Sequence, residues 1–211
     1  MTTFEHALLG MNGLLATGLH RRFGWKLAVL AAVAAIAPDW DGVPMLFDMS
    51  RFEVGHRVWG HNLLTCCFLG LGLASIDYRF DLIGRAAKSM TRWRPLRELA
   101  PSVDVRHSFS RPTWLVWVLV ATVAALSQIP ADAVVSGAEG LSDWALKPLW
   151  PFSNFTWIYP MIPWGNVGVT IIFAITMIAQ VKQPAHVQSI AITALVSVVA
   201  YLCIWSAWFP R

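Results

Sequence analysis

Side chains able to bind a cation stand at the ends of the apolar segments of this chain. Histidine and carboxylate together are ligands for Zn²⁺, and also for Mn²⁺ or Fe²⁺. Ionisable groups near membrane depth are costly unless they are paired, bind a metal or line water. We therefore predict a divalent metal site, with room for two ions. The predicted metal ligands are His6, Asp39, Asp41, His56, His61 and Asp132.

The spacing of two of these histidines limits how they can share an ion. His56 and His61 are five residues apart, about 140° around a helix, so they do not lie on one helical face. Both can bind one metal only if His56 precedes the start of the helix. Gly55 and Gly60 beside them allow such an irregular start.

The carboxylates are spaced differently. Asp39 and Asp41 follow Pro38 in a predicted loop, where both can turn toward one centre. Gln128 and Asp132 are four residues apart and share a helical face, although a proline between them disturbs the helix.

Each of these residues also has a purely structural interpretation. Asp39 and Asp132 are typical of turns and caps, and the histidines are also typical of interfacial positions. Arg57 has three acidic partners available in Asp39, Asp41 and Glu53. A further three histidines fall among basic residues and are not expected to be catalytic: His20, His107 and His186.

The elements that position these side chains are predicted to be membrane helices. Apolar residues make up 56% of the 211 residues and charged residues only 13%, against about a quarter in soluble domains. A spanning helix needs about 20 mainly apolar residues. We predict an all-α, integral membrane helical bundle of five to six transmembrane helices, forming a single domain over residues 1–211. The candidate runs are Ala7–Leu19, Trp25–Ala37, His61–Ile76, Thr113–Pro130, Trp164–Val181 and Val187–Phe209.

The charge distribution predicts the orientation of these helices. The segment Asp77–Pro112 carries eight Lys/Arg residues, and basic loops prefer the cytoplasm. If all six runs span, the inner side holds 12 of the 16 Lys/Arg and the outer side eight of the 12 acids. The predicted metal ligands then gather on the outer face of a multi-pass membrane protein. The basic loop is expected to meet the lipid bilayer, and no nucleic acid is expected because no aromatic or Gly-rich reader accompanies it.

Three motifs resemble a known family when they are taken in order. An early His6, the sequence PDWD at 38–41 and the sequence HRVWGH at 56–61 resemble the inner-membrane, metal-dependent hydrolases typified by YdjM. The later segment Gln128–Asp132 followed by Pro151-Phe152 is the counterpart of that family's HxxxD helix and loop. The resemblance covers about the first 155 residues and implies a multi-pass protein of the bacterial inner (plasma) membrane. The family is in turn distantly similar to zinc-dependent phospholipase C and P1-type nucleases, which implies a phosphoester substrate.

The chain departs from the family pattern at three positions. Gln128 stands where the resemblance implies a histidine, and glutamine is a poor metal ligand. Gly60 and Asn62 replace the Thr and Ser that often flank the second histidine of HRxxxH. The change at Gln128 is compatible with a smaller metal site, or with a scaffold that has lost catalysis.

These observations predict a membrane-bound metal-dependent hydrolase that acts on a phosphoester or lipid-linked substrate, such as a phospholipid. A metal-activated water would be the nucleophile, with zinc or manganese as the cofactor. Asp41 is the candidate general base, and Arg57 would stabilise charge on a phosphoryl oxygen. The alternative is a non-catalytic membrane scaffold or partner-binding subunit with a degenerate metal site. A transporter is a third, weaker hypothesis, because no acid lies at mid-span. The oligomeric state is not predicted.

Overall fold

A computed structural model describes residues 1–90, 109–136 and 145–208 of the chain, and its fold is all-α. The prediction of an all-α bundle is confirmed, and the described residues form no named strand. The elements are α1 (Thr3–Thr17), α2 (Leu19–Phe23), α3 (Lys26–Ile36), η1 (Ala37–Leu46), α4 (Met49–Gly55), α5 (Leu63–Phe80), α6 (Leu82–Met90), α8 (Arg111–Leu126), α9 (Gln128–Ala133), α10 (Val167–Lys182), η2 (Pro184–His186) and α11 (Val187–Trp208).

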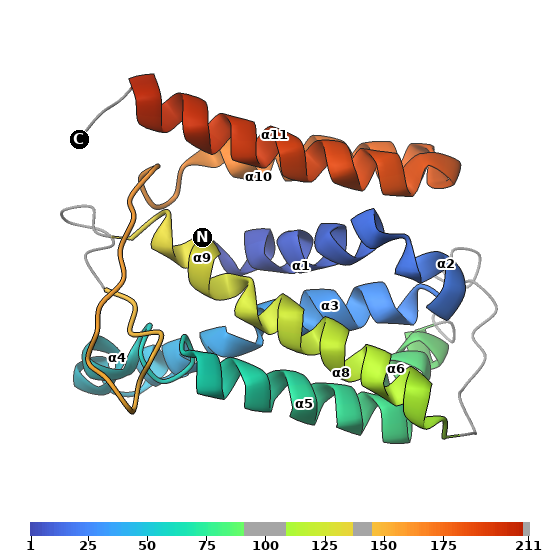
Figure 1. The fold of residues 1–211 in the computed structure, drawn as a ribbon, viewed down its shortest axis with the longest axis horizontal. Helices are drawn as coiled ribbons and strands as arrows, with labels where there is room; N and C mark the ends of the chain where they lie inside the picture. The colour runs from blue at the N-terminus through green and yellow to red at the C-terminus, as the bar shows by residue number, and fades with distance from the viewer. Residues whose placement is uncertain (91–108, 137–144, 209–211) are drawn as a thin grey trace.

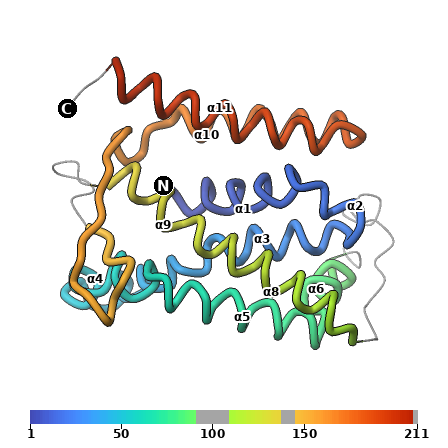
Figure 2. Tube along the Cα trace, viewed as in Figure 1, coloured from blue at the N-terminus to red at the C-terminus, as the bar shows by residue number. Residues whose placement is uncertain are grey.

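Within the described parts of the chain, six long helices run antiparallel through the bundle (Figure 1). Helices α1, α5 and α10 run in one direction, and α3, α8 and α11 run back. The turns that contain α2, α6 and η2 lie at one end of the bundle. The opposite end holds the N-terminus, η1, α4, α9 and the irregular chain that leads into α10, as the trace in Figure 2 also shows. All the predicted ligands lie at this end, including His6 in the first turn of α1 and His56 and His61 in the loop between α4 and α5.

Among the residues that the structure describes, four helical stretches are long and apolar enough to cross a membrane: 26–46, 63–80, 111–133 and 184–208. Helix α10, with 16 residues, is apolar but shorter, and α1, with 15 residues, is shorter too. Helix α1 lies between α3 and α11 (Figure 1), so its neighbours cover much of its surface. The chain is therefore a multi-pass membrane protein whose bundle includes two shorter helices.

Small residues set the closest helix contacts. A Cβ at Gly10 would lie 2.5 Å from the carbonyl oxygen of Ala31, and one at Gly70 would lie 2.4 Å from Cα of Thr122. Glycine at these positions lets α1 approach α3 and lets α5 approach α8. Such close approach is how helices associate in lipid, where the hydrophobic effect between them is absent.

Two predicted boundaries were wrong. The helix after the HRVWGH motif begins at Leu63, two residues after the start of the predicted run at His61, because the Asn62 side chain caps it by accepting from the Thr65 amide at 2.8 Å. It still reaches 18 residues because it continues to Phe80, past the predicted end. The segment predicted as a loop after α3 is instead the 3₁₀ helix η1 followed by α4. The basic segment also begins as helix in α5 and α6, and its residues 91–108 lie outside the described part of the chain.

Candidate metal centre

The candidate site is built where η1 and the loop of residues 56–62 meet. The Gly60 amide donates to Oδ2 of Asp41 at 2.8 Å, which ties the loop to η1. A Cβ at Gly60 would lie 1.8 Å from the Pro38 carbonyl oxygen, so only glycine permits this approach. Arg57 in the same loop has a φ of 60°, a left-handed conformation that is costly for a non-glycine residue.

Three predicted ligands from three elements converge at this place. His6 of α1, Asp39 of η1 and Asp132 of α9 each offer one ligand atom, and these atoms lie within 4.8 Å of one another. His6 Nε2 is 3.1 Å from Oδ1 of Asp132. His6 and Asp132 are buried, whereas a quarter of the Asp39 side chain is exposed. The open side of the site is therefore the side of Asp39.

His61 places a second imidazole beside this group and contacts both of its carboxylates. Its Nε2 is 3.1 Å from Oδ2 of Asp132 and 3.4 Å from Oδ1 of Asp39. Ligand atoms on one tetrahedral zinc, at bond lengths of about 2.0–2.2 Å, are separated by about 3.4 Å. The distances among these groups therefore fit the edges of a zinc coordination shell, and they are also hydrogen-bond distances.

Asp41 contacts the ring nitrogen of His61 that faces away from Asp39 and Asp132. Its Oδ2 is 2.9 Å from Nδ1 of His61, and its Oδ1 is 3.2 Å from Nδ1 of His56. The carboxylate is fully buried and both of its oxygens are used. A carboxylate on the far nitrogen of a ligand histidine fixes the orientation of the ring. The ligand roles predicted for Asp41 and His56 stay predictions. The geometry supports a different role for Asp41, which is to orient the rings of His61 and His56.

Carboxylates surround His61 closely enough to change its protonation. Burial by itself lowers the pKa of His61, but the hydrogen bonds with Asp132, Asp39 and Asp41 raise that pKa well above its ordinary value. A proton on Nε2 of His61 compensates the charge of these acids, and a metal cation bound at Nε2 would replace that proton. A buried group of carboxylates needs such a compensating cation.

Arg57 lies on the other side of Asp132. It donates to Oγ of Ser136 at 2.5 Å, and its second terminal nitrogen is 3.9 Å from Oδ1 of Asp132. Ser136 in turn donates to the Asp132 carbonyl at 2.6 Å. The α-amino group of Met1 also donates to Oδ1 of Asp132. Asp132, a predicted ligand, thus contacts two positive groups and the two histidines His6 and His61.

Gln128 faces the same ligands from α9. Its amide nitrogen donates to Oδ1 of Asp39 and lies 3.0 Å from Nε2 of His61. Its buried Oε1 has no hydrogen-bond partner, and neither has Nδ1 of His6. The four-residue spacing to Asp132 correctly indicated a shared face. Sequence reasoning missed Thr3, which donates to Oδ2 of Asp39 at 3.0 Å; its only signal is a position one turn before His6.

The fold and the site together define a multi-pass membrane protein with a His/Asp cluster at one end of its bundle. The chain belongs to the YdjM inner membrane protein family, whose model matches residues 1–209. That match extends well beyond the first 155 residues on which the motif resemblance rested. No curated protein and no solved structure gives a significant match to the chain.

Proposed function

We propose that the chain is a membrane-bound, metal-dependent hydrolase whose site opens at the outer face of a bacterial inner membrane. The observation that carries the proposal is the convergence of His6, Asp39 and Asp132 from three elements, with His61 in contact with both carboxylates. Their separations suit one zinc or manganese ion. A bound cation supplies a Lewis acid and lowers the pKa of a coordinated water.

The residues behind the ligands have distinct tasks in this proposal. Asp41 is a positioning residue, because both of its oxygens hold histidine rings and none is available to a substrate. His56 is partly exposed and oriented by Asp41, so we assign it, in place of Asp41, the removal of a proton from water.

The substrate side of the proposal rests on charge and access. Arg57 beside Asp132 places a buried guanidinium where negative charge on a phosphoryl oxygen would be stabilised. Asp39 lines the partly exposed side by which a substrate reaches the site. Together with the motif resemblance, these features support a phosphoester at the membrane surface as the substrate class.

Metal content tests the proposal directly. Elemental analysis of detergent-purified protein should find zinc or manganese at close to one ion per chain, and the His61→Ala and Asp39→Ala variants should each lose it. Glu53→Ala is the matched control, because Glu53 is an exposed acid at the same end of the bundle. Absence of metal after reconstitution with zinc and with manganese would overturn the proposal.

One observation favours the second candidate, a non-catalytic scaffold. The Gln128 amide already donates a hydrogen bond to Asp39. The contacts of His6 and His61 with Asp132 are also hydrogen-bond distances, so these side chains can satisfy one another without a metal. A scaffold of this kind should co-purify with a stable partner protein. In that case His61→Ala and Asp39→Ala would leave the metal content unchanged at zero.

A further inference from the structure

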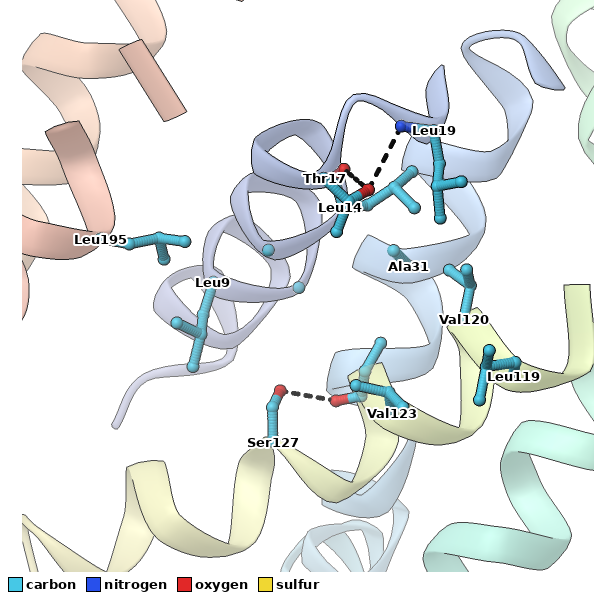
Figure 3. Close-up of a pocket in the computed structure, with 13 residues that line it drawn as sticks. Leu9, Leu14, Thr17, Leu19, Ala31, Leu119, Val120, Val123, Ser127 and Leu195 are labelled. Carbon is cyan, nitrogen blue, oxygen red and sulfur yellow. Dashed lines mark hydrogen bonds between the residues drawn. The ribbon is translucent and has the colours of Figure 1, made fainter. Parts of the chain in front are cut away.

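An apolar groove lies between α1 and α8 and is walled by residues from α3 and α11. Figure 3 shows Leu9 and Leu195 on one side of it and Val123 on the other. Its volume is about 330 Å³. The groove runs along α1 from Leu9 to Thr17, a separation of eight residues or roughly 12 Å of helix.

The groove offers hydrocarbon surroundings and opens sideways. Its two hydroxyl groups are already bonded to backbone carbonyls, Thr17 to Leu14 at 2.6 Å and Ser127 to Ala124 at 2.7 Å. Val123 on its rim is 56% exposed on a helix that is long and apolar enough to span the membrane. The surroundings of such an opening are lipid, and no polar atom of the lining needs a partner.

The length, lining and opening of the groove suit a lipid chain. A single extended hydrocarbon chain is narrow enough for the space, and the lining offers it only apolar contacts. Because the groove opens sideways toward lipid, the occupant to which we commit is one acyl chain.

One end of the groove adjoins the candidate metal centre. Leu9 follows His6 by three residues, less than one turn of α1, and Ser127 directly precedes Gln128. We infer that the groove holds one acyl chain of a phospholipid whose phosphoester end faces the His6–Asp132 cluster. That this phospholipid is the substrate rests on the proposed function. The binding of its acyl chain in the groove can be tested without any hydrolysis.

The test uses a substitution that fills the groove. A Cβ at Gly13 on the groove wall would have no atom within 4 Å, so Gly13→Trp directs an indole into open space. Gly72 of α5 is equally open and lies outside the groove, so Gly72→Trp is the matched control. Val123→Trp fills the groove from the opposite wall, should Gly13→Trp fail to fold.

The probe is a phospholipid with a diazirine near the end of one acyl chain, in vesicles of phosphatidylethanolamine and phosphatidylglycerol. After photolysis, the label should map to residues 9–17 and 119–127 of the unmodified chain. Gly13→Trp or Val123→Trp should lower that label at least tenfold, about 1.4 kcal/mol in binding, and Gly72→Trp should not. Label that is absent from these residues, or unchanged in both groove variants, would overturn the inference.

A second readout separates this inference from the proposed function. In an active protein, Gly13→Trp should lower the ratio of long-chain phospholipid hydrolysis to soluble phosphodiester hydrolysis at least tenfold. An unchanged ratio would show that the lipid is not the substrate. If neither ester is hydrolysed but the label maps to the groove and is lost in the groove variants, acyl-chain binding stands and the hydrolase proposal fails.

Discussion

Gln128 occupies the place in the site where the family motif implies a histidine. Its amide nitrogen lies 3.0 Å from Nε2 of His61 and contacts Asp39, while its oxygen is buried without a partner. We expect Gln128→His to add an imidazole ligand and to raise zinc affinity at least about tenfold, because imidazole is a far better zinc ligand than an amide. Competition with a chromophoric chelator measures this affinity.

The control for this substitution is another buried glutamine. Gln180 in α10 donates to Asn12 at 2.7 Å, with no part in the candidate site, so Gln180→His should leave zinc affinity unchanged. An equal affinity in the unmodified chain and Gln128→His would show that α9 does not face a metal.

His56 and His61 are expected to differ in kind, although one motif contains both. His56→Gln should keep the bound metal and lower kcat by about 100-fold or more, because general-base groups contribute 10²–10⁴ in rate. His61→Ala should lose the metal as well as the activity. Metal content and a pH–rate profile distinguish the roles, since the loss of a base removes the acidic limb of the profile. Loss of metal from His56→Gln would instead make His56 a ligand, as its sequence context suggests.

Residue type and position predicted which side chains gather, but not how they divide the work. His6, Asp39, His61 and Asp132 stand at ends of apolar runs that must meet on one side, so their proximity follows from topology. Whether Asp39 or Asp41 faces His6 and Asp132 depends on the backbone conformation of η1. That conformation is set by tertiary contacts with the loop of residues 56–62.

At the scale of elements, the contact between η1 and that loop depends on Gly60. We expect Gly60→Ala to lower the free energy of unfolding by more than about 2 kcal/mol, because the added methyl group overlaps the Pro38 backbone and cannot be accommodated by a rotamer change. Thermal unfolding in detergent measures the effect. Gly42→Ala, whose added Cβ would come no closer than 4.0 Å to any atom, is the control. Equal melting temperatures for the two variants would contradict this account of the loop.

The long helices were predictable and their ends were not. Apolar runs of 16 to 22 residues produce α5, α8, α10 and α11 wherever lipid forces the backbone to bond within itself. The start of α5 depends instead on one side chain, Asn62, and the segment after α3 depends on packing against the loop. Neither has a periodic pattern to predict it.

At the scale of the whole molecule, the two ends of the bundle carry opposite chemistry. The end with η1 and α4 holds the His/Asp cluster, and the end with α2 and α6 holds basic residues such as Arg21, Arg22 and Lys88. The Lys26–Asp81 ion pair, at 2.8 Å, ties α3 to the residue between α5 and α6 at that basic end. The separation agrees with the orientation predicted from charge, in which the basic end faces the cytoplasm.

Labelling of introduced cysteines tests that orientation. Arg51→Cys in α4 and Lys88→Cys in α6 place exposed thiols at opposite ends of the bundle, in a background where the three native cysteines are replaced by alanine. A membrane-impermeant maleimide added to intact cells of a Gram-negative host with a permeabilised outer membrane should label the first variant. The second should be labelled only after lysis, because the inner membrane shields it. The reverse pattern would place the His/Asp cluster in the cytoplasm, and any substrate would then have to be sought in the inner leaflet.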